Sequence, residues 1–299
     1  MSKVEGFDDL TGGQLKALCI KLGGMDIVNA ILRDEITVEV KEMIKKLFDR
    51  NGRRIPPDGM KSSVCDPNAS FKLTQPKIDY ATRLARLVNY FPTGTIFLST
   101  EEFQAQSEEL IEQLKQDNLL SNLLKGVHLP VCFPQFVVDD YGKGMDSVFL
   151  PAVGKSYEEQ FPGRKFYNYR KGELEKKISI IEGSRHDKFI DKMTKGSFAG
   201  IQFFPLQGFS INANREQMKA LPQSILLSGG IDIATAMVAY PDVLARDYNT
   251  PGYDCAALSW RSAGGSLFFG AYGDELVFGA CGYLGPANDS YSGGLLFLG

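Results

Sequence analysis

Histidine is scarce in this chain, and cysteines at metal-binding spacing are missing. Only His128 and His186 occur among 299 residues, and neither has a second histidine at helix-turn spacing, so a multi-histidine metal site is excluded. The five cysteines are scattered without a CxxC pair, which is typical of reduced thiols rather than of a disulfide framework or a zinc site. We therefore expect no metal, no cofactor and no catalytic residue, and predict that the protein is not an enzyme.

Excess positive charge and long apolar runs are missing as well. The sequence has 33 Lys and Arg against 36 Asp and Glu, a formal net charge of -3, whereas nucleic-acid binders carry a basic stripe. No uninterrupted apolar run reaches the ~18 residues of a membrane helix, and the first residues, MSKVEGFDDL, lack a secretory-signal pattern. We therefore expect no nucleic-acid partner, no membrane insertion, and a location in the cytoplasm or export without a visible signal.

The final segment of the chain is built from few residue types. After Arg261 there is no Lys, Arg, His, Gln, Met, Thr, Ile or Trp. Aromatic side chains stand among glycines instead, and the only charged residues are Asp274, Glu275 and Asp289. Tyr and Phe give large contact areas at a small entropy cost, while Gly, Ser, Asn and Asp adapt in shape and hydrogen bonding, as in antibody loops. This composition predicts an exposed binding surface.

The order of helical and strand signals predicts an α+β chain, with helices first and a β-rich end last. Breaks in periodicity and clusters of Pro, Gly, Asn and Ser set the boundaries. We expect a helical module over 1–50, a linker over 51–74, a helical segment over 75–125 that packs on the C-terminal domain, and that domain over 126–299.

Individual elements can be predicted within this outline. Ser99 and Glu102 form a capping box at the start of a helix. The stretch 126–140 is β-prone, but its prolines indicate an edge or irregular strand. A helix is predicted around 229–240, and short strands joined by glycine-rich turns follow it: CAALSW, GSLFFGAY, ELVFGAC and GGLLFLG.

The order of elements from ILLSGGIDIATAMVAYPDVL to the last residue resembles a known family. A helix, then Ser259 and Trp260 at a strand end, then paired short strands around glycine turns, is similar to the end of the C-type lectin fold. The variant is the one shared with formylglycine-generating enzymes, and more specifically with the variable proteins of diversity-generating retroelements. The resemblance covers roughly the last 70 residues well and 126–228 loosely.

In such retroelement systems an error-prone reverse transcriptase randomises adenines in a template, and the copy replaces the 3′ end of the target gene. Randomising an AAC or AAT codon never gives Lys, Glu, Gln, Met or Trp. From Ser262 onward, Glu275 is the one residue from that set. The resemblance therefore implies a C-type-lectin-like domain whose variable region spans about 262–291.

Within that region we expect a ligand-binding face held on scaffold residues Trp260 and Leu267. Strand alternation should bury Leu267 and Phe269 and expose Phe268 and Gly270. The residues expected to form the variable face are Phe268, Gly270, Tyr272, Gly273, Asp274, Phe278, Gly279, Cys281, Gly282, Tyr283 and Gly285.

The resemblance implies a ligand that is a protein or a cell-surface molecule. Calcium-dependent sugar binding is not expected, because Pro286 is followed by Ala287 rather than by the residues of a calcium motif. Two alternatives stay open. One is an enzyme of the sulfatase-modifying type, which would need Cys255 and Cys281 together for copper, and the other is a phage receptor-binding protein.

A diversified face should contribute little to folding. Tyr272→Ser, Phe278→Asn and Tyr283→Asp, made together, are therefore expected to leave the melting temperature nearly unchanged. Replacing a glycine that the backbone requires for its positive φ should destabilise the protein. Replacing a glycine that arose at a randomised codon should be tolerated.

Overall fold

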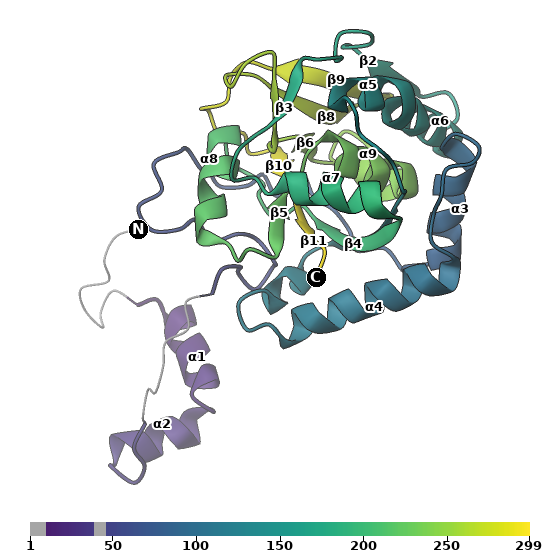
Figure 1. The fold of residues 1–299 in the computed structure, drawn as a ribbon. Coiled ribbons are helices and arrows are strands. Elements are labelled where there is room, and N and C mark those ends of the chain that lie inside the picture. The colour runs from purple at the N-terminus through teal and green to yellow at the C-terminus, as the bar shows by residue number, and fades with distance from the viewer. Residues whose placement is uncertain (1–9, 39–45) are drawn as a thin grey trace. The chain divides into compact units, whose positions relative to one another are not determined.

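The computed structural model describes residues 10–38 and 46–299, which fall into two compact units with a boundary between Lys45 and Lys46 (Figure 1). The first unit contains α1 (Gly12–Lys21) and α2 (Met25–Leu32). A capping box between Thr11 and Gln14 begins α1. Part of the helix expected before residue 50 falls on 39–45, outside the described residues.

The expected linker over 51–74 is wrong, because this segment is packed into the second unit. Phe48 and Arg54 form a β-bridge with each other and are buried. The Arg54 guanidinium donates to the carbonyls of Leu47 and Ile55 and to Oε1 of Gln217, and Val64 forms a bridge with Phe209. The Pro- and Gly-rich composition correctly indicates irregular backbone, but irregular backbone can be fixed by such long-range contacts.

The second unit is mixed α+β and contains several small sheets. One sheet, which we call the terminal sheet, has the order β1 (His128–Phe133), β4 (Phe198–Phe203), β11 (Leu295–Phe297) and β5 (Ile225–Leu227). All its neighbours are antiparallel. β1 is an edge strand, as its prolines predict, and β11 lies between β4 and β5, so the end of the chain is built into the sheet.

The other main sheet, which we call the hairpin sheet, carries the predicted variable region. Its order is β10 (Tyr291–Gly293), β6 (Gly252–Asp254), β8 (Ser266–Tyr272), β9 (Glu275–Cys281) and β2 (Lys165–Asn168). β8 and β9 form an antiparallel hairpin, while β10 pairs with β6 and β2 pairs with β9 in parallel. A pair of short strands, β3 (Ile178–Ile180) and β7 (Leu258–Trp260), completes the β-structure of the described residues.

Helices fill the space between the sheets and cover them. They are α3 (Tyr80–Tyr90), α4 (Thr100–Gln116), α5 (Tyr141–Gly144), α6 (Leu150–Gln160), α7 (His186–Lys195), α8 (Ile211–Glu216), α9 (Gly230–Ala239) and α10 (Pro241–Leu244). Shorter helical turns span Ser121–Lys125, Met145–Phe149 and Gln217–Ala220. The predicted capping box of Ser99 and Glu102 begins α4.

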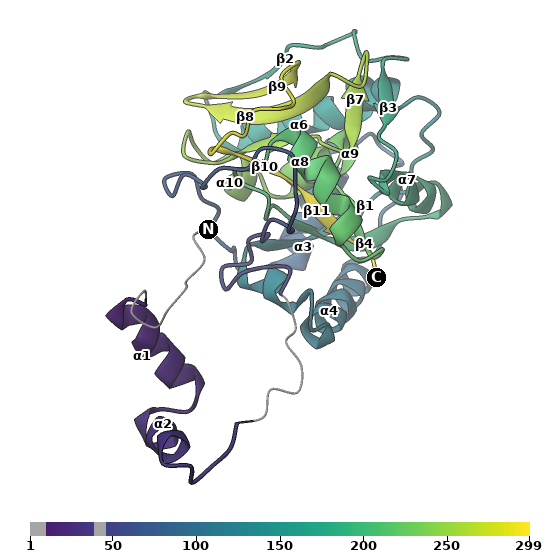
Figure 2. The ribbon, with the colours of Figure 1, turned by 90° about the vertical axis from the view of Figure 1, so that its left-hand side faces the viewer.

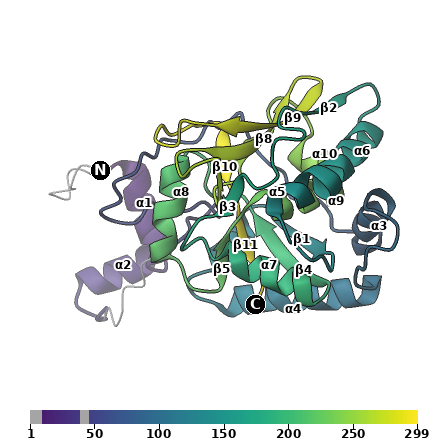
Figure 3. The same cartoon turned by 45° about the horizontal axis from the view of Figure 1, so that its top comes forward.

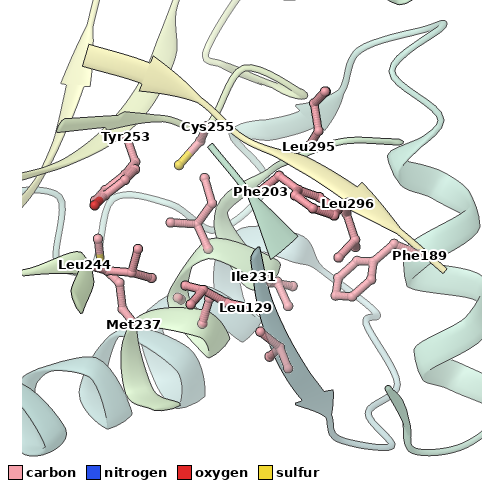
Figure 4. Close-up of a cluster of buried hydrophobic side chains, with 14 of the residues drawn as sticks. Leu129, Phe189, Phe203, Ile231, Met237, Leu244, Tyr253, Cys255, Leu295 and Leu296 are labelled. Carbon is pink, nitrogen blue, oxygen red and sulfur yellow. The ribbon is translucent and has the colours of Figure 1, made fainter. Parts of the chain in front are cut away.

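α9 is the central helix of this unit. Every one of its residues is buried, and it lies between the hairpin sheet on one side and the terminal sheet with α4 on the other (Figure 2, Figure 3). Ile231 and Met237 of α9 pack with side chains from both sheets (Figure 4). In the same view Tyr253 and Cys255 point from the end of β6 into this cluster. The inner face of the hairpin sheet is therefore part of the main core.

Among the described residues, no helix is both long and apolar enough to cross a membrane.

Candidate ligand-binding face

The register of the β8–β9 hairpin decides which predicted residues share a face. Asp254 lies opposite Phe268, and Phe268 lies opposite Gly279. Opposed residues in a sheet point to the same side, and successive residues along a strand point to alternate sides. The register therefore identifies the residues on the side away from α9. We call this side the outer face, and its members include Asp254, Phe268, Gly270, Tyr272, Gly279 and Cys281.

Burial follows the predicted alternation on the inner side, but on the outer side Gly270 and Gly279 are buried as well. Leu267 and Phe269 are fully buried, while Phe268 between them is half-buried. The expectation for Gly270 is wrong, since it is buried. It lies beneath the ring of Tyr272, whose Cε2 would be 3.0 Å from a Cβ at this position.

Phe278 does not lie on the outer face, contrary to its place in the predicted variable face. It lies opposite Phe269 on the inner side, with ring centroids 4.8 Å apart and no exposed surface. The expected exposure of Phe278 is therefore wrong. The triple change that includes Phe278→Asn should now lower the melting temperature, because the amide would be buried among apolar side chains without a partner.

The two scaffold residues differ in their surroundings. Leu267 is in the core, as expected. Trp260 is only partly buried, and the guanidinium groups of Arg170 and Arg261 lie over its ring, 5.0 and 4.2 Å from the ring centroid. Glu173 accepts from both arginines at 3.5 and 2.9 Å. Cation–π contacts therefore hold Trp260 at the edge of the core.

The remaining predicted residues occupy a turn and a loop. Gly273 and Asp274 make the tight turn of the hairpin, and Gly273 has a φ of +61°. Gly282, Tyr283 and Gly285 follow β9 and are exposed. A Cβ at Gly282 or at Gly285 would meet no atom within 4 Å.

A pocket of about 490 Å³ lies between the outer face and this loop. Four of the predicted residues line it, together with residues that the sequence did not indicate. The lining comprises Phe209, Ser210, Ile211, Asp254, Phe268, Tyr272, Cys281, Tyr283, Pro286, Ala287, Asn288 and Tyr291. Aromatic rings dominate it, and the Phe268 and Tyr291 centroids are 5.8 Å apart. The Tyr272 and Tyr291 hydroxyl groups are hydrogen-bonded to each other.

Asp254 is the acidic residue of this pocket, and sequence reasoning missed it. Its exposed fraction is 7%, and within the described residues no hydrogen bond or ion pair reaches its carboxylate. Burial raises the pKa of Asp254 to about 7, and the positive charge of Arg215 partly offsets that rise. Arg215 donates instead to the carbonyls of Ala256, Leu258 and Ala263. The one available signal was a carboxylate inside the apolar stretch GYDCAALSW.

The two cysteines of the enzyme alternative point to opposite sides of the hairpin sheet. The backbone N–H of Cys255 donates to the carbonyl of Leu267. The sulfur of Cys255 points into the core (Figure 4). Cys281 lies opposite Ser266, on the outer face, where its sulfur contacts the backbone of Tyr283. The two thiols therefore do not form the pair that a two-cysteine copper site needs. Across residues 10–38 and 46–299, no three His, Cys, Asp or Glu residues gather into a possible metal site.

Phe278 and Phe268 provide a matched test of the two sides. Phe278→Ala should lower the free energy of unfolding by about 3–5 kcal/mol, because it opens a cavity in the core. Phe268→Ala removes the same atoms from a half-buried position, so it should lower the free energy of unfolding by only about 1 kcal/mol. Urea denaturation of both variants measures the difference, and equal losses would show that both rings are core.

Asp254→Asn should change how stability depends on pH. In the folded protein the pKa of Asp254 is raised to about 7, above the ~3.9 of an unfolded chain. The stability that its neutral form contributes is therefore fully present below the unfolded pKa and is lost as the pH rises through about 7. Asn never ionises. The free energy of unfolding of the variant, relative to that of the wild type, should therefore rise by about 2–4 kcal/mol from about pH 4 to about pH 8. A stability difference that is the same at both pH values would mean that the carboxyl titrates as if exposed.

Comparison of the chain with protein-family models, with curated proteins and with solved structures gave no match. The function of the outer face has therefore to be inferred from its own residues. They combine exposed aromatic rings, small neighbours and one buried carboxyl in a concave surface.

Proposed function

We propose that this protein binds a protein or cell-surface ligand through the outer face and the loop after β9. We further propose that it is the variable protein of a diversity-generating retroelement, built on a C-type-lectin-like scaffold. The observation that carries the proposal is that predicted variable positions on the outer face pack on one another, Gly270 against Tyr272 and Gly279 against Phe268.

The glycines of the outer face illustrate this packing. A Cβ at Gly270 would meet the ring of Tyr272 at 3.0 to 3.1 Å, and a Cβ at Gly279 would meet the ring of Phe268 at 2.8 Å. In both cases the neighbouring atoms belong to the far end of another predicted variable side chain. Replacing the glycine therefore displaces a ring that is itself free to vary, and leaves the backbone and the core in place.

The aromatic surface extends beyond the pocket to the other edge of the hairpin sheet. Tyr167 of β2 lies opposite Val277, which places it on the outer face. Its ring stacks on Tyr169 with centroids 6.1 Å apart. Tyr167, Tyr169, Tyr272 and Tyr283 are 41%, 58%, 43% and 83% exposed. Exposed aromatic patches of this kind are typical of surfaces that bind other macromolecules.

Two features support the C-type-lectin-like scaffold. Helix α9, strand β7 ending at Trp260 and the β8–β9 hairpin follow one another in the order that the resemblance implies. The chain then returns through β11 to the middle of the terminal sheet. The variable region is thus bounded on both sides by fixed structure, which a replaceable gene segment requires.

The encoding DNA tests the retroelement origin. We expect a near-copy of the 3′ end of the gene, differing at adenines, beside a reverse-transcriptase gene. Sequencing this end from many cells should show substitutions at the codons of outer-face and loop residues, and none at those of Leu267, Phe269 and Phe278. Variation spread evenly over both sets, or the absence of a template copy, would contradict the proposal.

The loop and the turn should respond differently to the same kind of substitution. Gly282→Tyr and Tyr283→Asp are expected to change the free energy of unfolding by no more than about 0.5 kcal/mol, because both positions face open space. Gly273→Tyr should cost about 1–2 kcal/mol, because a side chain is strained at positive φ. Chemical denaturation of the three variants gives the comparison. Losses above about 2 kcal/mol at Gly282 and Tyr283 would mean that this loop is part of the folded core.

A further inference from the structure

Asp254 is a buried carboxylate without a partner in the described residues. Burying an unpaired charge is costly, so such a group normally has a counter-charge or a donor. Arg215, whose positive charge acts on Asp254, donates its hydrogen bonds to three backbone carbonyls. The Tyr272 and Tyr291 hydroxyls are paired with each other. The protein thus leaves this carboxylate open toward the pocket that it lines.

The walls of the pocket suit a positive charge. Phe268, Tyr272, Tyr283 and Tyr291 line it, and the faces of aromatic rings attract ammonium and guanidinium groups. No Lys or Arg lines the pocket, and none occurs after Arg261. An anionic ligand would therefore meet only the charge of Asp254, while a cationic one would find both a counter-charge and aromatic faces.

We propose that this pocket binds a cationic group of the ligand, an ammonium or guanidinium such as a Lys or Arg side chain, with Asp254 as its counter-charge. The inference rests on the proposed function and specifies the ligand chemistry of the same face. The pocket's volume of about 490 Å³ is ample for one long side chain.

The position of Asp254 in the chain gives this contact a general role. Asp254 is on β6, before the expected variable region of 262–291, whereas most of the rings around it are inside that region. A fixed carboxylate would keep one cationic contact in every version of the face. The surrounding side chains would then select the rest of the ligand.

Matched small probes test the charge requirement on the full chain. N-acetyl-arginine methylamide carries a guanidinium, N-acetyl-citrulline methylamide is its neutral isostere, and N-acetyl-glutamate methylamide is anionic. Binding is measured by ligand-observed NMR titration. The arginine probe should bind at least about tenfold more tightly than the citrulline probe, and the glutamate probe should bind most weakly.

Two variants locate the effect. Asp254→Asn should lower the affinity for the arginine probe by at least about tenfold and leave the affinity for the citrulline probe unchanged. Asp187→Asn is the control, because it makes the same change in net charge at an exposed position on α7, and it should alter neither. Circular dichroism shows whether each variant is folded.

The outcomes separate this inference from the proposed function. If arginine and citrulline probes bind equally and Asp254→Asn has no effect, the cation inference is overturned while binding by the face stands. A preference for the glutamate probe, or no binding of any probe, also overturns it. In each case the proposed function is judged separately by sequence variation at the outer-face codons.

Discussion

The two-residue periodicity of the β8–β9 hairpin is the constraint on which the rest of the structure depends. Leu267 and Phe269 of β8 and Phe278 of β9 fill the core, while Phe268, Tyr272 and Cys281 on the same strands face outward. One hairpin therefore supplies both a core layer and the outer face for which we propose a binding role. Because the two sets of side chains point in opposite directions, a change in one set need not disturb the other.

Buried structure holds both ends of this hairpin. Before it, α9 is anchored at its first turn, where the Tyr141 hydroxyl accepts from the N–H groups of Gly230 and Ile231 and contacts Nε2 of His186 at 2.9 Å. Burial lowers the pKa of His186 to about 3, so the ring stays neutral. Because the Tyr141 oxygen already accepts from two N–H groups, its own O–H donates to Nε2 of His186. After the hairpin, β11 is locked between β4 and β5. The outer face is thus carried by a frame that is anchored elsewhere in the core.

Several elements of the second unit could be predicted from the sequence, because their signals are local. The short strands, the helix at 229–240 and the capping box of Ser99 and Glu102 follow from periodicity and from turn residues. Phe278 was misplaced because its side depends on the register, and the register depends on the tight turn at Gly273 and Asp274. A composition argument treats Phe268 and Phe278 alike, whereas pairing separates them.

The pocket could not be predicted, because its residues come together through pairings between distant segments. Asp254 meets Phe268 through the β6–β8 pairing, and Tyr291 joins them through the parallel pairing of β10 with β6. The packing of the 51–74 segment is a similar case. Its composition indicates irregular backbone, but says nothing of the acceptors that Arg54 finds on Leu47, Ile55 and Gln217.

The separation of the two sides of the hairpin is the central claim, and a saturation mutagenesis scan of 262–291 with protease resistance as the readout tests it most directly. The account predicts that tolerance alternates along β8 and β9. Phe268, Tyr272 and Cys281 should accept most substitutions, while Leu267, Phe269, Leu276 and Phe278 should accept almost none. In the loop after β9, Gly282, Tyr283 and Gly285 should be tolerant, whereas Leu284 between them is buried in the core and should not be. Uniform intolerance across both sides would contradict the account, because the outer face would then be a structural surface and not one free to vary for binding.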